Sequence, residues 1–170
     1  PYPSAWYCID DVRPLAPGEL KRFSLCGEDI VYFRTESGEL AAMEAYCPHM
    51  GANFGHGGRV VGEHVQCPFH GFEFGTDGRC AKVPESKGVP KLKARMLHTD
   101  VVMDHLFVWY DYLGRPPSFR LRLWDHPLVS TLSTSITMRT HPQELAEMPL
   151  APADAAFVAW LLAGGQDPRR

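Results

Sequence analysis

The sequence lacks the features that mark membrane, exported and nucleic-acid-binding proteins. None of its apolar runs approaches the roughly 20 residues that a membrane-spanning helix needs, and its first residues carry no secretory signal pattern. The 170 residues have a net charge of −3, so there is no excess of positive charge to bind nucleic acid. We therefore expect a cytoplasmic protein that has neither a membrane nor a nucleic acid as its partner.

Cysteine is also scarce, and its count of five is odd. A disulfide framework is not expected in the cytoplasm. Cys8, Cys26 and Cys80 are therefore predicted to be reduced thiols or small core residues. The remaining two, Cys47 and Cys67, each belong to a short motif.

These motifs are Cys47-Pro48-His49 and Cys67-Pro68-Phe69-His70, separated by the 17 residues 50–66. Each supplies one thiolate and one imidazole. Together they provide two sulfur and two nitrogen ligands, which is a complete ligand set for a metal centre. Cys47, His49, Cys67 and His70 are therefore the predicted metal-binding and cofactor-binding residues.

Two kinds of centre fit this ligand set. A zinc ion accepts two Cys and two His, but such sites usually pair Cys with Cys and His with His. A [2Fe–2S] cluster can take two Cys on one iron and two His on the other. The alternating order seen here favours the cluster, because each loop can point its Cys inward and its His outward. Glycines that bring backbone N–H groups near an anionic centre also flank both motifs: Gly51, Gly55, Gly57, Gly58, Gly71, Gly75 and Gly78.

The segment from Cys47 to Cys80 resembles the cluster-binding segment of Rieske proteins: CPHMGANFGHGGRVVGEHVQCPFHGFEFGTDGRC. A wider stretch, Trp6 to Arg120, is similar to the N-terminal domain of Rieske mononuclear-iron oxygenases, and most similar to the steroid hydroxylase and cholesterol desaturase-like branch. The resemblance implies that Cys47 and Cys67 hold the inner iron. It also implies that His49 and His70 hold the outer, more exposed iron.

Respiratory Rieske proteins differ at three positions near the cluster. Their motifs resemble CTHLGC and CPCHGS, with an extra disulfide where this chain has Ala52 and Phe69, and a serine where it has Phe72. Hydrogen bonds to the sulfurs raise the reduction potential, so their loss should lower it. The resemblance thus implies a potential in the lower part of the Rieske range. Met50 and Phe69 are expected to shield the cluster from water.

The chain is predicted to be all-β, because short β-prone runs alternate with turn residues. Gly62-Glu63 is predicted to form a tight hairpin between the two ligand motifs. The family fold implies stacked antiparallel sheets with a small cluster-binding subdomain. The predicted strands are 5–9, 20–25, 30–34, 40–45, 59–61, 64–66, 93–100 and 106–110.

Pro116-Pro117 marks the predicted end of a Rieske domain, placed at residues 1–120. Residues 121–170 form a tail with a predicted strand at 129–140 and a predicted helix at 155–163. The tail resembles the approach to an oxygenase motif, E-N-x-x-D-x-x-H, that ligates a mononuclear iron. Met148 stands where its Asn is expected, and Phe157 stands where its His is expected. We therefore expect this chain to transfer electrons without building the catalytic iron site.

The predicted function is one-electron transfer as the Rieske part of a non-haem iron oxygenase. The resemblance implies a flavin- or ferredoxin-type reductase as donor and an oxygenase catalytic domain or subunit as acceptor. A stand-alone Rieske ferredoxin and a zinc-stabilised binding module are the alternatives. Six basic residues follow the second motif and are expected to form a solvated strand face, with docking of an acidic reductase as the alternative: Arg79, Lys82, Lys87, Lys91, Lys93 and Arg95.

Overall fold

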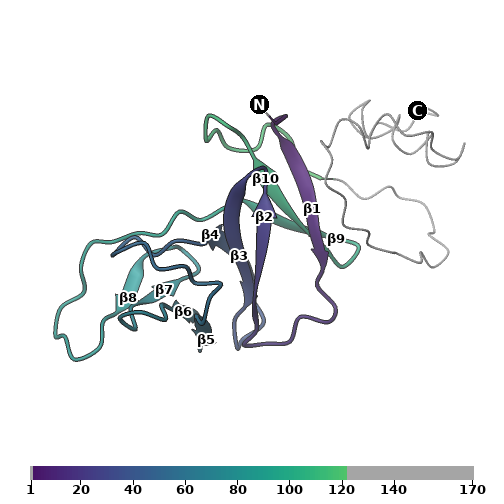
Figure 1. Ribbon diagram of the computed structural model, residues 1–170. Helices are drawn as coiled ribbons and strands as arrows, with labels where there is room; N and C mark the ends of the chain where they lie inside the picture. Colours follow the sequence, from purple (N-terminus) through teal and green to yellow (C-terminus); the bar gives the residue numbers. More distant parts are fainter. Residues whose placement is uncertain (1, 122–170) are drawn as a thin grey trace, which may run out of the picture. The chain divides into compact units, whose positions relative to one another are not determined.

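The computed structural model describes residues 2–121, which contain ten strands and no helix (Figure 1). The strands form three antiparallel sheets, so the predicted all-β fold is confirmed. The first sheet has the order β1 (Ala5–Asp11), β10 (His105–Tyr110), β9 (Thr99–Val102). The second has the order β2 (Leu20–Leu25), β3 (Glu28–Arg34), β4 (Leu40–Glu44). The third has the order β5 (Arg59–Val61), β6 (His64–Gln66), β7 (Glu73–Gly75), β8 (Cys80–Lys82). Residues 2–121 hold no helical membrane span.

Strand β3 lies between two hydrophobic cores. Successive side chains of a strand point to opposite faces. Ile30 and Tyr32 accordingly pack with residues of β1, β2 and β10, whereas Val31 and Phe33 pack with residues of the third sheet. A strand buried on both faces is apolar throughout, which explains the unbroken run Ile30–Phe33. The third sheet therefore packs against one face of β3, a strand that is buried on both faces.

Tight turns set the register of the hairpins. The predicted turn at Gly62-Glu63 is confirmed, because Val61 pairs with His64 across it and Gly62 has a φ of 59°. The β2–β3 turn uses Cys26 and Gly27, with φ values of 52° and 85°. Positive φ at both central residues matches the right-handed twist of the flanking strands. Cys26 thus has a conformational role in a turn.

The predicted strand at 93–100 is wrong over most of its length. β9 begins only at Thr99, and the preceding residues run between two sheets instead of along one. Lys93 bridges to Arg79, next to β8 of the third sheet, and Met96 bridges to Met43 in β4 of the second. Residues 92–94 bond to residues 78–80, and residues 95–97 bond to β4. Because the partner changes after three residues, only isolated bridges form. The three-residue strands β7 and β8 were not predicted, and the strand and helix predicted at 129–140 and 155–163 lie outside the described residues.

Replacing Gly78 by alanine is expected to lower the free energy of unfolding by at least about 2 kcal/mol, because Gly78 packs against the segment that precedes β9. Gly78 has a φ of 80°, and a Cβ there would lie 2.4 Å from the carbonyl oxygen of Ala94. The N–H of Ala94 donates to the carbonyl of Gly78 at 2.8 Å, so these two segments cannot move apart without losing this hydrogen bond. Urea unfolding would measure the loss.

Gly88 offers the matched control, because an added Cβ there meets no atom within 4 Å and its φ is not positive. Gly88→Ala should change the free energy of unfolding by less than about 0.5 kcal/mol. Equal unfolding midpoints for the two variants would contradict the close approach at Gly78.

Candidate metal centre

The two predicted ligand motifs form loops with the same backbone hydrogen bonds. In the first loop, the N–H of Cys47 donates to Ala52 at 2.9 Å, and the N–H of Gly51 donates back to Cys47 at 2.8 Å. In the second loop, the N–H of Cys67 donates to the carbonyl of Phe72 at 2.8 Å, and that of Gly71 donates back to Cys67 at 3.1 Å. Gly51 and Gly71 have φ values of 74° and 69°. The two loops therefore share one backbone frame, in which His49 is the second residue after its Cys and His70 is the third.

The two thiols lie together in the hydrophobic core. Cys47 is 3% exposed and Cys67 is 4% exposed, and both belong to the core that contains Phe54 and Phe74. Burial, together with the contact to the neighbouring Cys67 thiol, raises the pKa of Cys47 to about 11, although the N–H groups of His49 and Met50 oppose this shift. Two adjacent thiolates are unfavourable in such surroundings unless a metal cation binds them.

The two imidazoles form a second pair, and this pair is exposed. The ring centroids of His49 and His70 are 4.9 Å apart, with an angle of 69° between the rings. Phe72 stacks on His49 at 4.3 Å, and Phe69 lies against His70 at 3.9 Å. Phe69 is itself 62% exposed. The centre thus has a buried sulfur side and an exposed nitrogen side.

This separation tests which metal group fits the four side chains. A tetrahedral zinc ion would have all four ligands on one atom, whereas here thiol meets thiol and imidazole meets imidazole. A dinuclear cluster needs only two protein ligands on each metal, which is what a thiol pair and an imidazole pair provide. The donor set therefore fits a [2Fe–2S] cluster.

The other histidines of the described residues lie apart from this ligand set. His56 makes a 3.0 Å hydrogen bond through Nε2 with the guanidinium of Arg22, and His105 interacts through Nδ1 with the carbonyl of Met103 at 2.8 Å. His64 faces Glu73, a residue that the sequence did not single out. His126 and His141 lie outside the described residues.

Phe72 and Phe74 are two residues apart, a spacing that places both on the same face of a strand, but their surroundings differ. Phe74 is fully buried. Phe72 is only partly buried, and it packs against the core and against His49 at the same time. The spacing alone could not show that Phe72 meets a predicted ligand.

Part of the basic stretch after the second motif is paired with carboxylates. Lys82 contacts Glu73 at 3.1 Å, and Arg79 lies 3.6 Å from Asp77. Arg95 contacts both Glu28 and Glu44. These three cations are thus paired within the chain, and of them Lys82 alone lies on a strand, β8.

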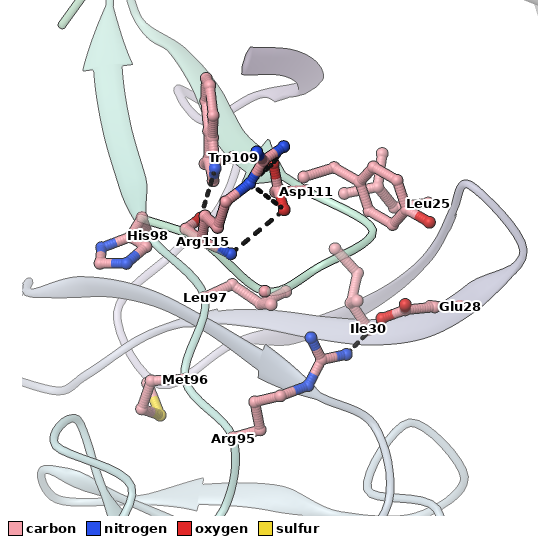
Figure 2. A pocket seen from close by; sticks show the side chains of 12 residues that line it. Leu25, Glu28, Ile30, Arg95, Met96, Leu97, His98, Trp109, Asp111 and Arg115 are labelled. Atoms are coloured by element: carbon pink, nitrogen blue, oxygen red, sulfur yellow. Dashed lines mark hydrogen bonds and ion pairs between the residues drawn. The ribbon is translucent and has the colours of Figure 1, made fainter. Parts of the chain in front are cut away.

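A cavity of about 120 Å³ lies away from both loops (Figure 2). Two guanidinium groups line it, but Figure 2 shows each of them bonded to a carboxylate: Arg95 to Glu28, and Arg115 to Asp111. The Arg115 guanidinium holds the pKa of Asp111 well below its usual range. With both cations already paired, this cavity offers no free positive group for an anionic ligand.

Comparison with known proteins matches the chain to a family model described as Rieske [2Fe-2S] domain, over residues 5–93. Cholesterol 7-desaturase nvd 1 of Ciona intestinalis is 36% identical over 134 residues, which cover 78% of this chain and 27% of that protein. The oxygenase component of the 3-ketosteroid-9-alpha-monooxygenase of Mycolicibacterium smegmatis is 39% identical over 127 residues, 74% of this chain and 33% of that protein. The chain therefore spans about a quarter to a third of the length of these relatives.

Among solved structures, dicamba monooxygenase bound to dicamba superimposes with a TM-score of 0.59 and 27% sequence identity. The match covers 67% of this chain and 36% of that one. The similarity thus extends from the sequence motifs to the arrangement of the strands.

Proposed function

The chain belongs to the Rieske [2Fe-2S] domain family, and on this premise we propose that Cys47, His49, Cys67 and His70 bind its cluster for one-electron transfer. Domains of this family bind a [2Fe–2S] cluster. The buried thiol pair would ligate the inner iron, and the exposed imidazole pair would ligate the outer iron. When bound, the cluster supplies a site that accepts and releases one electron. The single observation that carries the proposal is the division of four ligands into a buried sulfur pair and an exposed nitrogen pair.

The protein's own residues would orient and shield this site. The matching hydrogen bonds of the two loops hold each Cys inside and each His outside. The apolar core around Cys47 and Cys67 excludes water, and the N–H groups of His49 and Met50 point at the sulfur of Cys47. Such second-layer contacts set the potential of a metal site. Because His49 and His70 are exposed, electrons would pass between the cluster and its partners through these imidazoles.

We further propose that the chain serves an oxygenase of the steroid type. The two relatives named above are a cholesterol desaturase and the oxygenase component of a ketosteroid monooxygenase. The acceptor would be the mononuclear iron of an oxygenase catalytic domain, and the donor a flavin- or ferredoxin-type reductase. We propose a cytoplasmic location, because Cys8, Cys26 and Cys80 form no disulfide and such thiols persist in a reducing compartment.

Anaerobic purification with ample iron tests the cluster assignment. The expected product contains two irons and two acid-labile sulfides per chain, and it gives an electron paramagnetic resonance signal when reduced. Stoichiometric zinc without labile sulfide would overturn the proposal, because the four ligands would then hold a single redox-inactive ion.

The midpoint potential is expected to lie between roughly −150 and 0 mV, in the lower part of the Rieske range. Phe72 stacks a ring on His49 where respiratory Rieske proteins place a hydroxyl donor, and the cysteines carry no disulfide beside the cluster. Fewer donors to the sulfurs stabilise the added electron less. A spectroelectrochemical titration measures the value, and a potential typical of the respiratory proteins would contradict it.

A further inference from the structure

Glu73 is the one charged residue of residues 2–121 that is buried as a whole residue. The side chain of Asp111 is also only 2% exposed, but it belongs to the cavity that lies away from both ligand loops. Burying a carboxylate is costly unless hydrogen bonds and an opposite charge compensate it. An apolar residue at such a position often gives equal or greater stability. Stability of the sheet therefore does not explain why a charged residue occupies position 73.

Glu73 lies directly beside the second ligand loop. It pairs with Gln66 across β6 and β7, and Gln66 immediately precedes Cys67. The hydrogen bond from Cys67 to Phe72 closes the loop one residue before Glu73. Because side chains alternate along a strand, Glu73 points to the face of the sheet opposite Phe74, which packs in the core with Cys67. The carboxylate and the core that contains Cys67 thus lie on opposite faces of β7.

The partners of Glu73 compensate its charge unequally. Lys82 donates through Nζ at 3.1 Å and Gln66 through Nε2 at 3.0 Å, while Nδ1 of His64 lies 3.6 Å away. The Glu73 side chain is only 4% exposed, but that of Lys82 is 64% exposed. Water screens an exposed charge far more than a buried one. At the ligand loop, the field of the carboxylate should therefore exceed that of the ammonium.

We propose that the buried carboxylate of Glu73 lowers the reduction potential of the cluster, and that Lys82 partly offsets this effect. The inference rests on the proposed function of the four ligands. The cluster gains one negative charge on reduction, and a nearby negative charge disfavours that gain. Glu73 thus acts on the cluster only through the electric field of its carboxylate. It binds neither the metal nor a reacting atom.

Three variants test this inference in the full chain, with the midpoint potential as the readout. Glu73→Gln keeps the shape and removes the charge, so the potential should rise, with at least a threefold change in the reduced-to-oxidised ratio at a fixed applied potential. This corresponds to roughly 30 mV for a one-electron couple. Lys82→Gln should shift the potential in the opposite direction. The double variant should lie between the unmodified protein and Glu73→Gln, because Lys82 offsets only part of the effect of the carboxylate.

Asp77→Asn is the matched control. It removes a carboxylate that follows the same strand but is 61% exposed and paired with Arg79, so its effect on the potential should be the smallest. Lys82 is exposed enough that its replacement should fold even if Glu73→Gln does not. Unchanged potentials in Lys82→Gln, or equal shifts in Glu73→Gln and Asp77→Asn, would overturn the inference.

Iron and sulfide contents separate the two possible failures. A cluster present at full content with an unshifted potential contradicts the role of Glu73 alone. Absence of a cluster from the unmodified protein contradicts the proposed function itself.

Discussion

Replacing Cys67 by serine is expected to abolish cluster binding, with iron and labile sulfide falling from about two of each per chain to near zero. A serine hydroxyl is a harder and far less acidic ligand than a thiol, and iron–sulfur clusters are held by thiolates. Cys67 is also 4% exposed and in contact with Cys47, so no water can easily take its place. Metal and sulfide analysis, together with visible absorbance, measures the loss.

Cys80 provides the matched control for this experiment. It is a buried free thiol in the same core as Cys67, but its Sγ contacts the carbonyl of Lys82 at 3.7 Å rather than another thiol. Cys80→Ala should therefore retain the cluster. Loss of the cluster in both variants would indicate that packing of this core, rather than ligation by Cys67, had been disturbed.

Replacing Phe54 by alanine is expected to lower the free energy of unfolding by about 3–5 kcal/mol. Phe54 is fully buried, and its ring meets that of Phe74 edge-on at 5.7 Å. Truncation would leave a cavity in the core that surrounds Cys47 and Cys67. Since the backbone N–H of Phe54 donates to Ala45 at 2.7 Å, the chain cannot easily shift to fill that space. Urea unfolding of the metal-free chain measures the change.

Phe69→Ala is the control for this variant, because it removes the same side chain from the second ligand loop. Phe69 is mostly exposed, so its truncation should change the free energy of unfolding by less than about 0.5 kcal/mol. A loss at Phe69 comparable to that at Phe54 would contradict the placement of the core between the two loops. If the metal-free chain does not fold, the melting temperatures of the cluster-loaded variants give the same comparison.

Most strands could be predicted because their signals are local. The run Ile30–Phe33 is apolar. Gly62-Glu63 is recognisable as a turn because glycine readily adopts the positive φ that a tight turn needs. β7 and β8 were missed because three residues carry too little periodicity by themselves. β5 and β6 are equally short, but the tight turn at Gly62-Glu63 marks them, and no two-residue turn separates β7 from β8. The segment before β9 was misassigned, since its β-prone residues bond successively to different sheets. No local pattern distinguishes such a crossing from a strand.

The proposed ligand set likewise comes from short motifs, since each Cys and its His are two or three residues apart. The surroundings of the ligands could not be predicted in this way. Phe72 meets His49 across two loops that lie far apart in the sequence. Glu73 alternates with buried neighbours, a pattern that predicts exposure to water, yet its partners from β6 and β8 cover it.

Ligand chemistry, turn positions and the all-β character are properties of short stretches of chain, so residue types and spacing suffice to predict them. Burial, the pairing of thiol with thiol and imidazole with imidazole, and the unequal screening of Glu73 and Lys82 depend on which distant strands meet. Those contacts arise from the packing of three sheets into two cores. The packing minimises exposed apolar surface over the whole of residues 2–121, and no single segment of the sequence encodes it.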